Sequence, residues 1–151
     1  MWYSRVVGDL SVVANVVDYY NKEFATAQIE TKISGSLEKN AQDLSGHTTY
    51  RYTQLQDIES ILKYLNIKYD KIRSDLYKKY NEHYNRDLSD RSIEKYLDGE
   101  STVVDMQMLI NEVALVRNQY LGLLKGIEVK GWQINNIVKL RSLGIEDANL
   151  L

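Results

Sequence analysis

The chain contains no proline and no cysteine, and its single phenylalanine stands against twelve tyrosines. Without proline, no position lacks a backbone amide or sterically blocks a helical turn, so long uninterrupted helices are possible. The absence of cysteine excludes disulfides and thiolate metal sites, and it is typical of proteins in a reducing compartment. We therefore expect a cytoplasmic protein with long helices.

Long apolar runs are also missing. Residues 1–20 are rich in valine and tyrosine, but Asn15 and Asp18 interrupt them and no small-residue cleavage pattern follows. Such a segment is neither a signal peptide nor a membrane span. We expect no membrane partner.

The totals are those of an ordinary globular protein of 151 residues, with 44% hydrophobic and 26% charged side chains. We expect one helical domain over 1–151, with an N-terminal helical arm at 1–48, a long-helix core at 49–144 and a tail at 145–151. The net charge of −2 is unevenly spread, because 63–97 holds nine basic against six acidic side chains and 125–141 holds four against one. Two basic patches therefore alternate with acidic segments.

Two stretches carry apolar residues at steps of three and four, which is the pattern of a heptad seam on a long amphipathic helix. They predict an all-α fold in which long amphipathic helices form a helical bundle, assembled into a homo-oligomer. Whether the seams pack within one chain or between chains stays open, as does the number of subunits. The proposed oligomer seam comprises Leu55, Ile58, Leu62, Leu65, Ile72, Leu76, Val113, Val116, Tyr120, Leu123 and Ile127.

Cap residues and glycines predict where the helices begin and end. In the first third of the chain we expect an extended or frayed lead at 1–8 and a helix from Asp9 to about Thr31 or Ile33. A break or kink at Ser34–Gly35, a short helix at 37–44 and a loop at 45–49 should follow. Gly46 fits a helix C-cap in that loop. A second long helix should then occupy 49–84.

In the remainder, Ser89 should cap a short helix that ends at Gly99. A long helix should begin at about Ser101 and stop or bend at Gly131. A last helix should follow from Trp132 and end at Gly144.

No group of residues converges on a recognisable reaction. His47 and His83 have no partner at metal-ligand spacing, and the acidic stretch at 87–105 lacks the alternating oxygen ligands of a calcium loop. The segment GLLKG lacks the spacing of a phosphate-binding loop. We expect no enzyme, no cofactor and no metal.

Basic and aromatic residues interleave on the outward side of the helix at 49–84, away from its seam. One interpretation is a solvated face, in which Asp70, Asp75 and Glu82 pair with nearby lysines and with Arg86. The other is a single-stranded nucleic-acid face, in which cations meet phosphates and tyrosine rings stack on bases. The candidate contact residues are Lys71, Arg73, Tyr77, Lys78, Lys79 and Tyr84.

Residues 50–144 resemble the UvsY recombination mediators of tailed phages. The resemblance is carried by the motif Lys71-x-Arg73-x-Asp75-x-Tyr77, within KIRSDLY, and by an ending of basic residue, glycine and aromatic at Lys130, Gly131 and Trp132. Ser74 stands where the family often has leucine, and residues 1–49 do not match the family.

The resemblance implies a non-catalytic accessory protein of homologous recombination that acts in the host cell cytoplasm. Such mediators form ring-like homo-oligomers, bind single-stranded DNA, loosen the single-strand-binding protein from it and help to load a RecA-like recombinase. The alternative is a helical scaffold or assembly adaptor of a phage that binds no nucleic acid, and whose tyrosines serve a protein interface. A small regulatory binder of a host enzyme is a third, weaker alternative.

Overall fold

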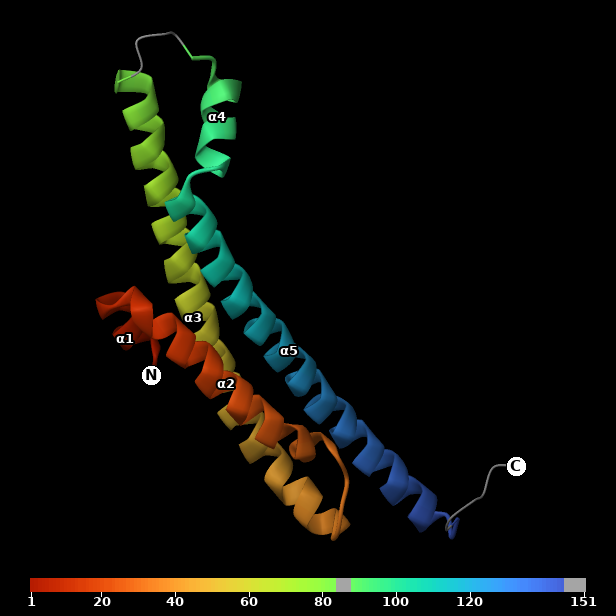
Figure 1. The fold of residues 1–151 in the computed structure, drawn as a ribbon. Helices are drawn as coiled ribbons and strands as arrows, with labels where there is room; N and C mark the ends of the chain where they lie inside the picture. The colour runs from red at the N-terminus through yellow and green to blue at the C-terminus, as the bar shows by residue number, and fades with distance from the viewer. Residues whose placement is uncertain (84–87, 146–151) are drawn as a thin grey trace. The chain divides into compact units, whose positions relative to one another are not determined.

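The computed structural model describes residues 1–83 and 88–145, and all regular structure within them is helical. Figure 1 shows the helices in chain order. The prediction of an all-α fold is confirmed for the described part of the chain. The elements are α1 (Tyr3–Gly8), η1 (Leu10–Val12), α2 (Val13–Ala27), η2 (Gln28–Thr31), α3 (Leu37–His83), α4 (Asp90–Asp98) and α5 (Ser101–Ser142).

Contacts between residues divide the chain into two compact units. The first comprises Met1–Asp18 and Asp57–Arg117, and the second comprises Tyr19–Gln56 and Asn118–Leu151. Three helices, α2, α3 and α5, therefore contribute residues to both units.

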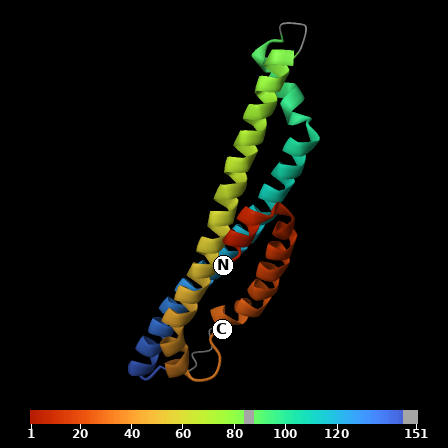
Figure 2. The same ribbon diagram turned by 90° about the vertical axis from the view of Figure 1, so that its left-hand side faces the viewer.

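The first eight residues are helical, so the prediction of an extended or frayed lead is wrong. The carboxylate of Asp57, on α3, accepts hydrogen bonds from the backbone amides of Trp2 at 2.8 Å and Tyr3 at 3.2 Å. These bonds satisfy two of the amides that a helix N-terminus leaves unpaired. Figure 2 shows α1 against α3, and Tyr64 donates from its hydroxyl to the backbone oxygen of Val7 at 3.3 Å. The cap lies more than fifty residues away in sequence.

The predicted helix start at Asp9 is confirmed, because its carboxylate accepts a hydrogen bond from the amide of Ser11 at 2.9 Å. That bond lowers the pKa of Asp9 below its ordinary value. The predicted break at Ser34–Gly35 is also confirmed, since Gly35 adopts a φ of +71° that other L-residues rarely tolerate.

The predicted loop at 45–49 is wrong, because α3 runs without interruption from Leu37 to His83. The hydroxyls of Thr48 and Thr49 donate to the backbone oxygens four residues earlier, at 2.8 and 2.9 Å, and so are satisfied inside the helix. Gly46 is a helix-interior residue with open space around its Cα. The predicted helix start at 49 is therefore twelve residues late.

In the second half, Ser89 caps α4 and Gly99 follows its last residue, as predicted. Gly131 does not stop or bend the chain into a separate last helix; α5 continues through it to Ser142. A Cβ at Gly131 would lie 3.0 Å from Leu44 Cδ2, so this glycine permits close packing of α3 against α5 within the second unit. Gly144 has a φ of +70° and ends the helical segment, as predicted.

Most of the predicted seam residues are buried within the single chain. Eight of them are fully buried: Leu55, Ile58, Leu65, Val113, Val116, Tyr120, Leu123 and Ile127. Leu62, Ile72 and Leu76 are half-buried. Each unit thus buries part of its own apolar seam, and a role of these residues between chains stays a prediction.

Among the described residues, no helix is long and apolar enough to cross a membrane.

Candidate nucleic-acid interface

The five predicted contact residues that the structure describes, from Lys71 to Lys79, lie in the C-terminal part of α3, beside α4, in the first unit (Figure 1). Arg73 makes three side-chain hydrogen bonds. Its guanidinium donates to Asp98 Oδ1 at 2.8 Å and to Glu94 Oε2 at 2.7 Å, both on α4. The guanidinium also donates a third hydrogen bond, from Nη1 to the Tyr69 hydroxyl at 3.3 Å. The hydrogen bond to Asp98 is the main reason why the pKa of Arg73 is raised.

The Tyr77 side chain also contacts α4. Its hydroxyl donates to Asp90 Oδ1 at 2.7 Å, and this bond raises the pKa of the phenol. One turn further along, the Tyr80 hydroxyl donates to Glu100, and its ring stacks on that of Tyr96 with centroids 5.8 Å apart. Tyr77 and Tyr80 therefore face α4. The sequence predicted an outward position for Tyr77, and in the structure its side chain is half-buried.

The three lysines are the exposed members of the predicted set. Lys71 pairs with Asp75 at 3.3 Å, one helical turn away, and both side chains are largely exposed. Lys78 and Lys79 are exposed, with no ion pair to any residue in the described part of the chain. Tyr84 lies outside the described residues. The face thus presents three lysines to solvent, while Arg73 and Tyr77 hold α4.

Carboxylates already occupy the positions where a phosphate would bind Arg73. Glu94 and Asp98 are 58% and 68% exposed, whereas the Arg73 side chain is only 21% exposed. A guanidinium with two parallel donors matches carboxylate and phosphate groups alike. The arrangement can therefore bind an anion at Arg73, but a nucleic acid would have to displace the side chains of α4 to reach it.

The sequence did not predict a buried polar cluster in the second unit. Arg51 donates twice to Glu30, at 3.0 and 2.6 Å, and also to Glu23 at 2.9 Å and to Gln54 at 2.8 Å. Tyr120, assigned only to the apolar seam, donates from its hydroxyl to Gln54 at 3.2 Å. Two carboxylates therefore surround one guanidinium, and the hydrogen bonds to Glu30 raise the pKa of Arg51. Arg51 lies four residues before Leu55, so extending the seam by one step would have found it.

The structure also gives separate roles to the three residues of the C-terminal family motif. Lys130 is only 4% exposed and donates from Nζ to the backbone oxygen of Glu30 at 3.0 Å. Gly131 makes room for Leu44, as described above. Trp132 is 60% exposed, and the Nζ of Lys125 lies 5.6 Å from its ring centroid. The first two residues join elements of the second unit, and the third is open to solvent.

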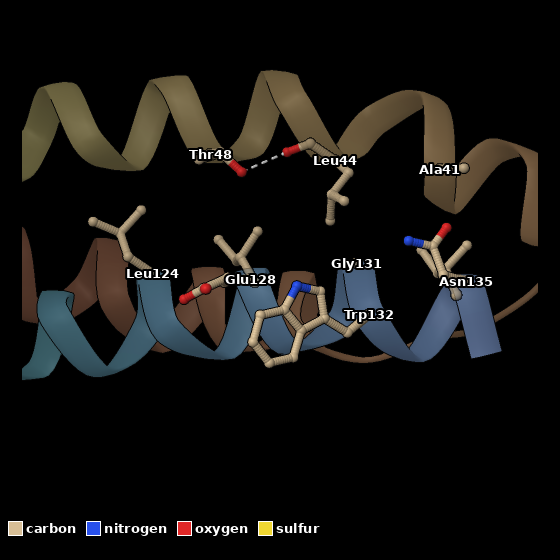
Figure 3. Close-up of a pocket in the computed structure, with 10 residues that line it drawn as sticks. Ala41, Leu44, Thr48, Leu124, Glu128, Gly131, Trp132 and Asn135 are labelled. Atoms are coloured by element: carbon tan, nitrogen blue, oxygen red, sulfur yellow. Dashed lines mark hydrogen bonds between the residues drawn. The ribbon is translucent and has the colours of Figure 1, made fainter. Parts of the chain in front are cut away.

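A cavity of ≈ 480 Å³ borders Trp132 (Figure 3). In the figure Leu44 points from α3 toward Gly131, and the Trp132 ring lies along α5 on the side of Glu128. The walls of the cavity are mostly apolar, and they include Leu44, Leu124, Ile127 and Ile134. Trp132 is not among the predicted contact residues, although its position between Lys125 and Lys139 is visible in the sequence.

The described residues contain no group of three or more His, Cys, Asp or Glu side chains that could hold a metal ion. The Nδ1 atom of His47 is buried without a hydrogen-bond partner, and His83 is exposed near the end of α3.

Comparisons with protein-family models, with curated proteins and with solved structures give no match for this chain.

Proposed function

We propose that this protein is a non-catalytic, single-stranded-DNA-binding recombination mediator. It would help to load a RecA-like recombinase onto DNA covered by single-strand-binding protein, and it would act as a homo-oligomer. The observation that carries the proposal is the guanidinium of Arg73, which binds two anionic groups at 2.7 and 2.8 Å beside exposed lysines. It lies within the motif by which the chain resembles the mediator family.

The division of roles on α3 suggests how DNA would bind. Lys78 and Lys79 are free to meet the phosphate backbone first, because their side chains are exposed, and Lys71 would exchange only a largely exposed pair with Asp75 for a phosphate. Arg73 and Tyr77 would engage only after α4 releases them. Acidic side chains near the lysines weaken binding by one copy, so useful affinity depends on several copies side by side.

A salt titration of oligonucleotide affinity tests this function. Each phosphate contact contributes about −0.7 to the slope of log affinity against log salt for a single strand. The variant Lys71→Ala with Lys78→Ala removes two exposed cations without touching the contacts to α4, and it should reduce the slope by about 1.4. The control Lys32→Ala with Lys39→Ala makes the same charge change in the second unit and should leave the slope unchanged. Absence of binding at low salt would refute the proposal.

The mediator role itself requires a further measurement. Filament formation by a RecA-like recombinase on DNA precoated with single-strand-binding protein should accelerate when the protein is added. Addition of the double lysine variant should give little acceleration. A protein that binds DNA but leaves loading unchanged would be a DNA-binding protein of another kind.

The contacts of Arg73 and Tyr77 also favour a second candidate, a helical scaffold or assembly adaptor. In that function the carboxylates of α4 are the permanent partners of both side chains. The scaffold predicts a defined oligomer with no nucleic-acid affinity at any salt concentration. Light scattering and fluorescence anisotropy with a labelled oligonucleotide, measured on one sample, separate the two functions.

A further inference from the structure

We infer that Trp132 is a stacking platform for a base of single-stranded nucleic acid, and that it forms a contact site in the second unit separate from the face on α3. The inference rests on the proposed function, since it takes the ligand to be a single strand. It goes beyond that function by assigning a site that neither the motif on α3 nor the proposed seam contains.

The exposure of Trp132 is the first observation. A tryptophan side chain gains most when buried, yet 60% of this residue is in solvent at the edge of a cavity. Leu44 points toward Gly131 next to this residue, and the cavity that Trp132 lines has mostly apolar walls (Figure 3). Aromatic rings of this kind accept any base, because every base has a π-face.

The charges around the ring are the second observation. Lys125 and Lys139 lie seven residues before and seven residues after Trp132, which places all three on one side of α5. Both lysines are exposed, and Lys125 already lies near the indole ring. Glu128 pairs with Lys125 at 2.8 Å, but both side chains are about half or more exposed, so the pair is weak. A basic, aromatic, basic column suits a strand whose phosphates flank a stacked base.

The same column argues for nucleic acid over a protein partner at this position. Lys125, Glu128 and Lys139 are exposed on the side of α5 that carries Trp132, which leaves one net positive charge there. Lys130 is buried, and Arg141 lies nine residues on, on the opposite side. The core of a protein interface is depleted of charged residues. The charge on this side of α5 is therefore complementary to a phosphate backbone.

Tryptophan fluorescence tests the inference directly, because Trp2 and Trp132 are the two tryptophans of the chain. In the variant Trp2→Phe, Trp132 is the only indole, and its emission should be quenched when oligo(dT) binds. Anisotropy of a labelled strand, measured on the same variant, reports binding independently. This arm needs no change at Trp132, so it does not depend on a substitution there folding correctly.

Substitution at Trp132 provides the second arm. Trp132→Ala should weaken binding of oligo(dT) by about 5- to 150-fold, which corresponds to the loss of one base stack. Trp132→Phe should keep most of the affinity. The control Met108→Ala removes another 60%-exposed side chain of α5 that has no such column of lysines, and it should change nothing.

The outcomes separate the two proposals. Binding of the strand without quenching of Trp132, or with full affinity in Trp132→Ala, overturns the stacking site and leaves the proposed function standing. No binding by the Trp2→Phe variant and by the unmodified protein overturns the proposed function as well. Quenching together with weaker binding by Trp132→Ala supports the site.

Discussion

Neutralising the two carboxylates that hold Arg73 should increase affinity for single-stranded DNA. The variant Glu94→Gln with Asp98→Asn keeps the size of both side chains and removes both negative charges. If DNA must displace these groups to reach Arg73, binding of DNA has to offset the loss of two ion pairs. Removing the pairs in advance removes that cost, so the variant should bind more tightly.

The size of the effect follows from the exposure of the partners. Glu94 and Asp98 are more than half exposed, so each pair belongs to the surface class and is worth about 0.2–1 kcal/mol. Two such pairs amount to about 0.4–2 kcal/mol, which is an affinity gain of about 2- to 30-fold. The same variant should lower the free energy of unfolding by a similar amount, because α4 loses two of its ion pairs with α3.

Anisotropy with a labelled oligonucleotide at fixed salt measures the gain. Removing any two negative charges favours DNA somewhat, so Asp70→Asn with Asp105→Asn serves as the control; both of these carboxylates are exposed and neither contacts Arg73. An equal gain in the control would mean that general electrostatics suffice. An unchanged or lower affinity of the Glu94/Asp98 variant would refute the argument that DNA displaces these carboxylates to reach Arg73.

Two further predictions concern stability and use chemical denaturation as the measurement. Gly46→Ala should stabilise the protein by about 0.5–1 kcal/mol, because alanine is the better residue inside a helix and open space surrounds this position. A destabilised variant would instead support the loop that the sequence predicted at 45–49. The hydrogen bond from Gln54 lowers the pKa of Glu23 below its ordinary value of 4.5, so its stabilising effect is present above that pH and is lost as the pH falls through the lowered value. Gln54→Ala should therefore lose less stability than the unmodified protein between about pH 5 and pH 3, and equal losses would contradict this cause.

The sequence predicted those helix boundaries that have a local cause. Asp9, Ser89 and Gly99 act on amides and carbonyls within a few residues, so the local pattern contains the information. Two of the errors have distant causes. Asp57 caps α1 from another helix, and Leu44 packs against Gly131 from a segment almost ninety residues away. Neither contact leaves a periodic signal near the residue that it stabilises.

The candidate site shows the same division. The motif around Arg73 was visible, as was its mixture of charges, and the pairing of Lys71 with Asp75 follows from their spacing on one helix. The partners of Arg73 and Tyr77 on α4 were not visible, because they depend on how α4 packs against α3. Spacing thus identified a set of residues, and the packing of the helices determined which of them face solvent.

The burial of Lys130 provides a chemical probe of the second unit. Its amine donates to Glu30 and is almost inaccessible, while Lys125 and Lys139 on the same helix are in solvent. An amine-acylating reagent should modify the two exposed lysines at once, and Lys130 only when the unit opens locally. The ratio of these labelling rates, read by mass spectrometry, measures the free energy of that opening at a single atom.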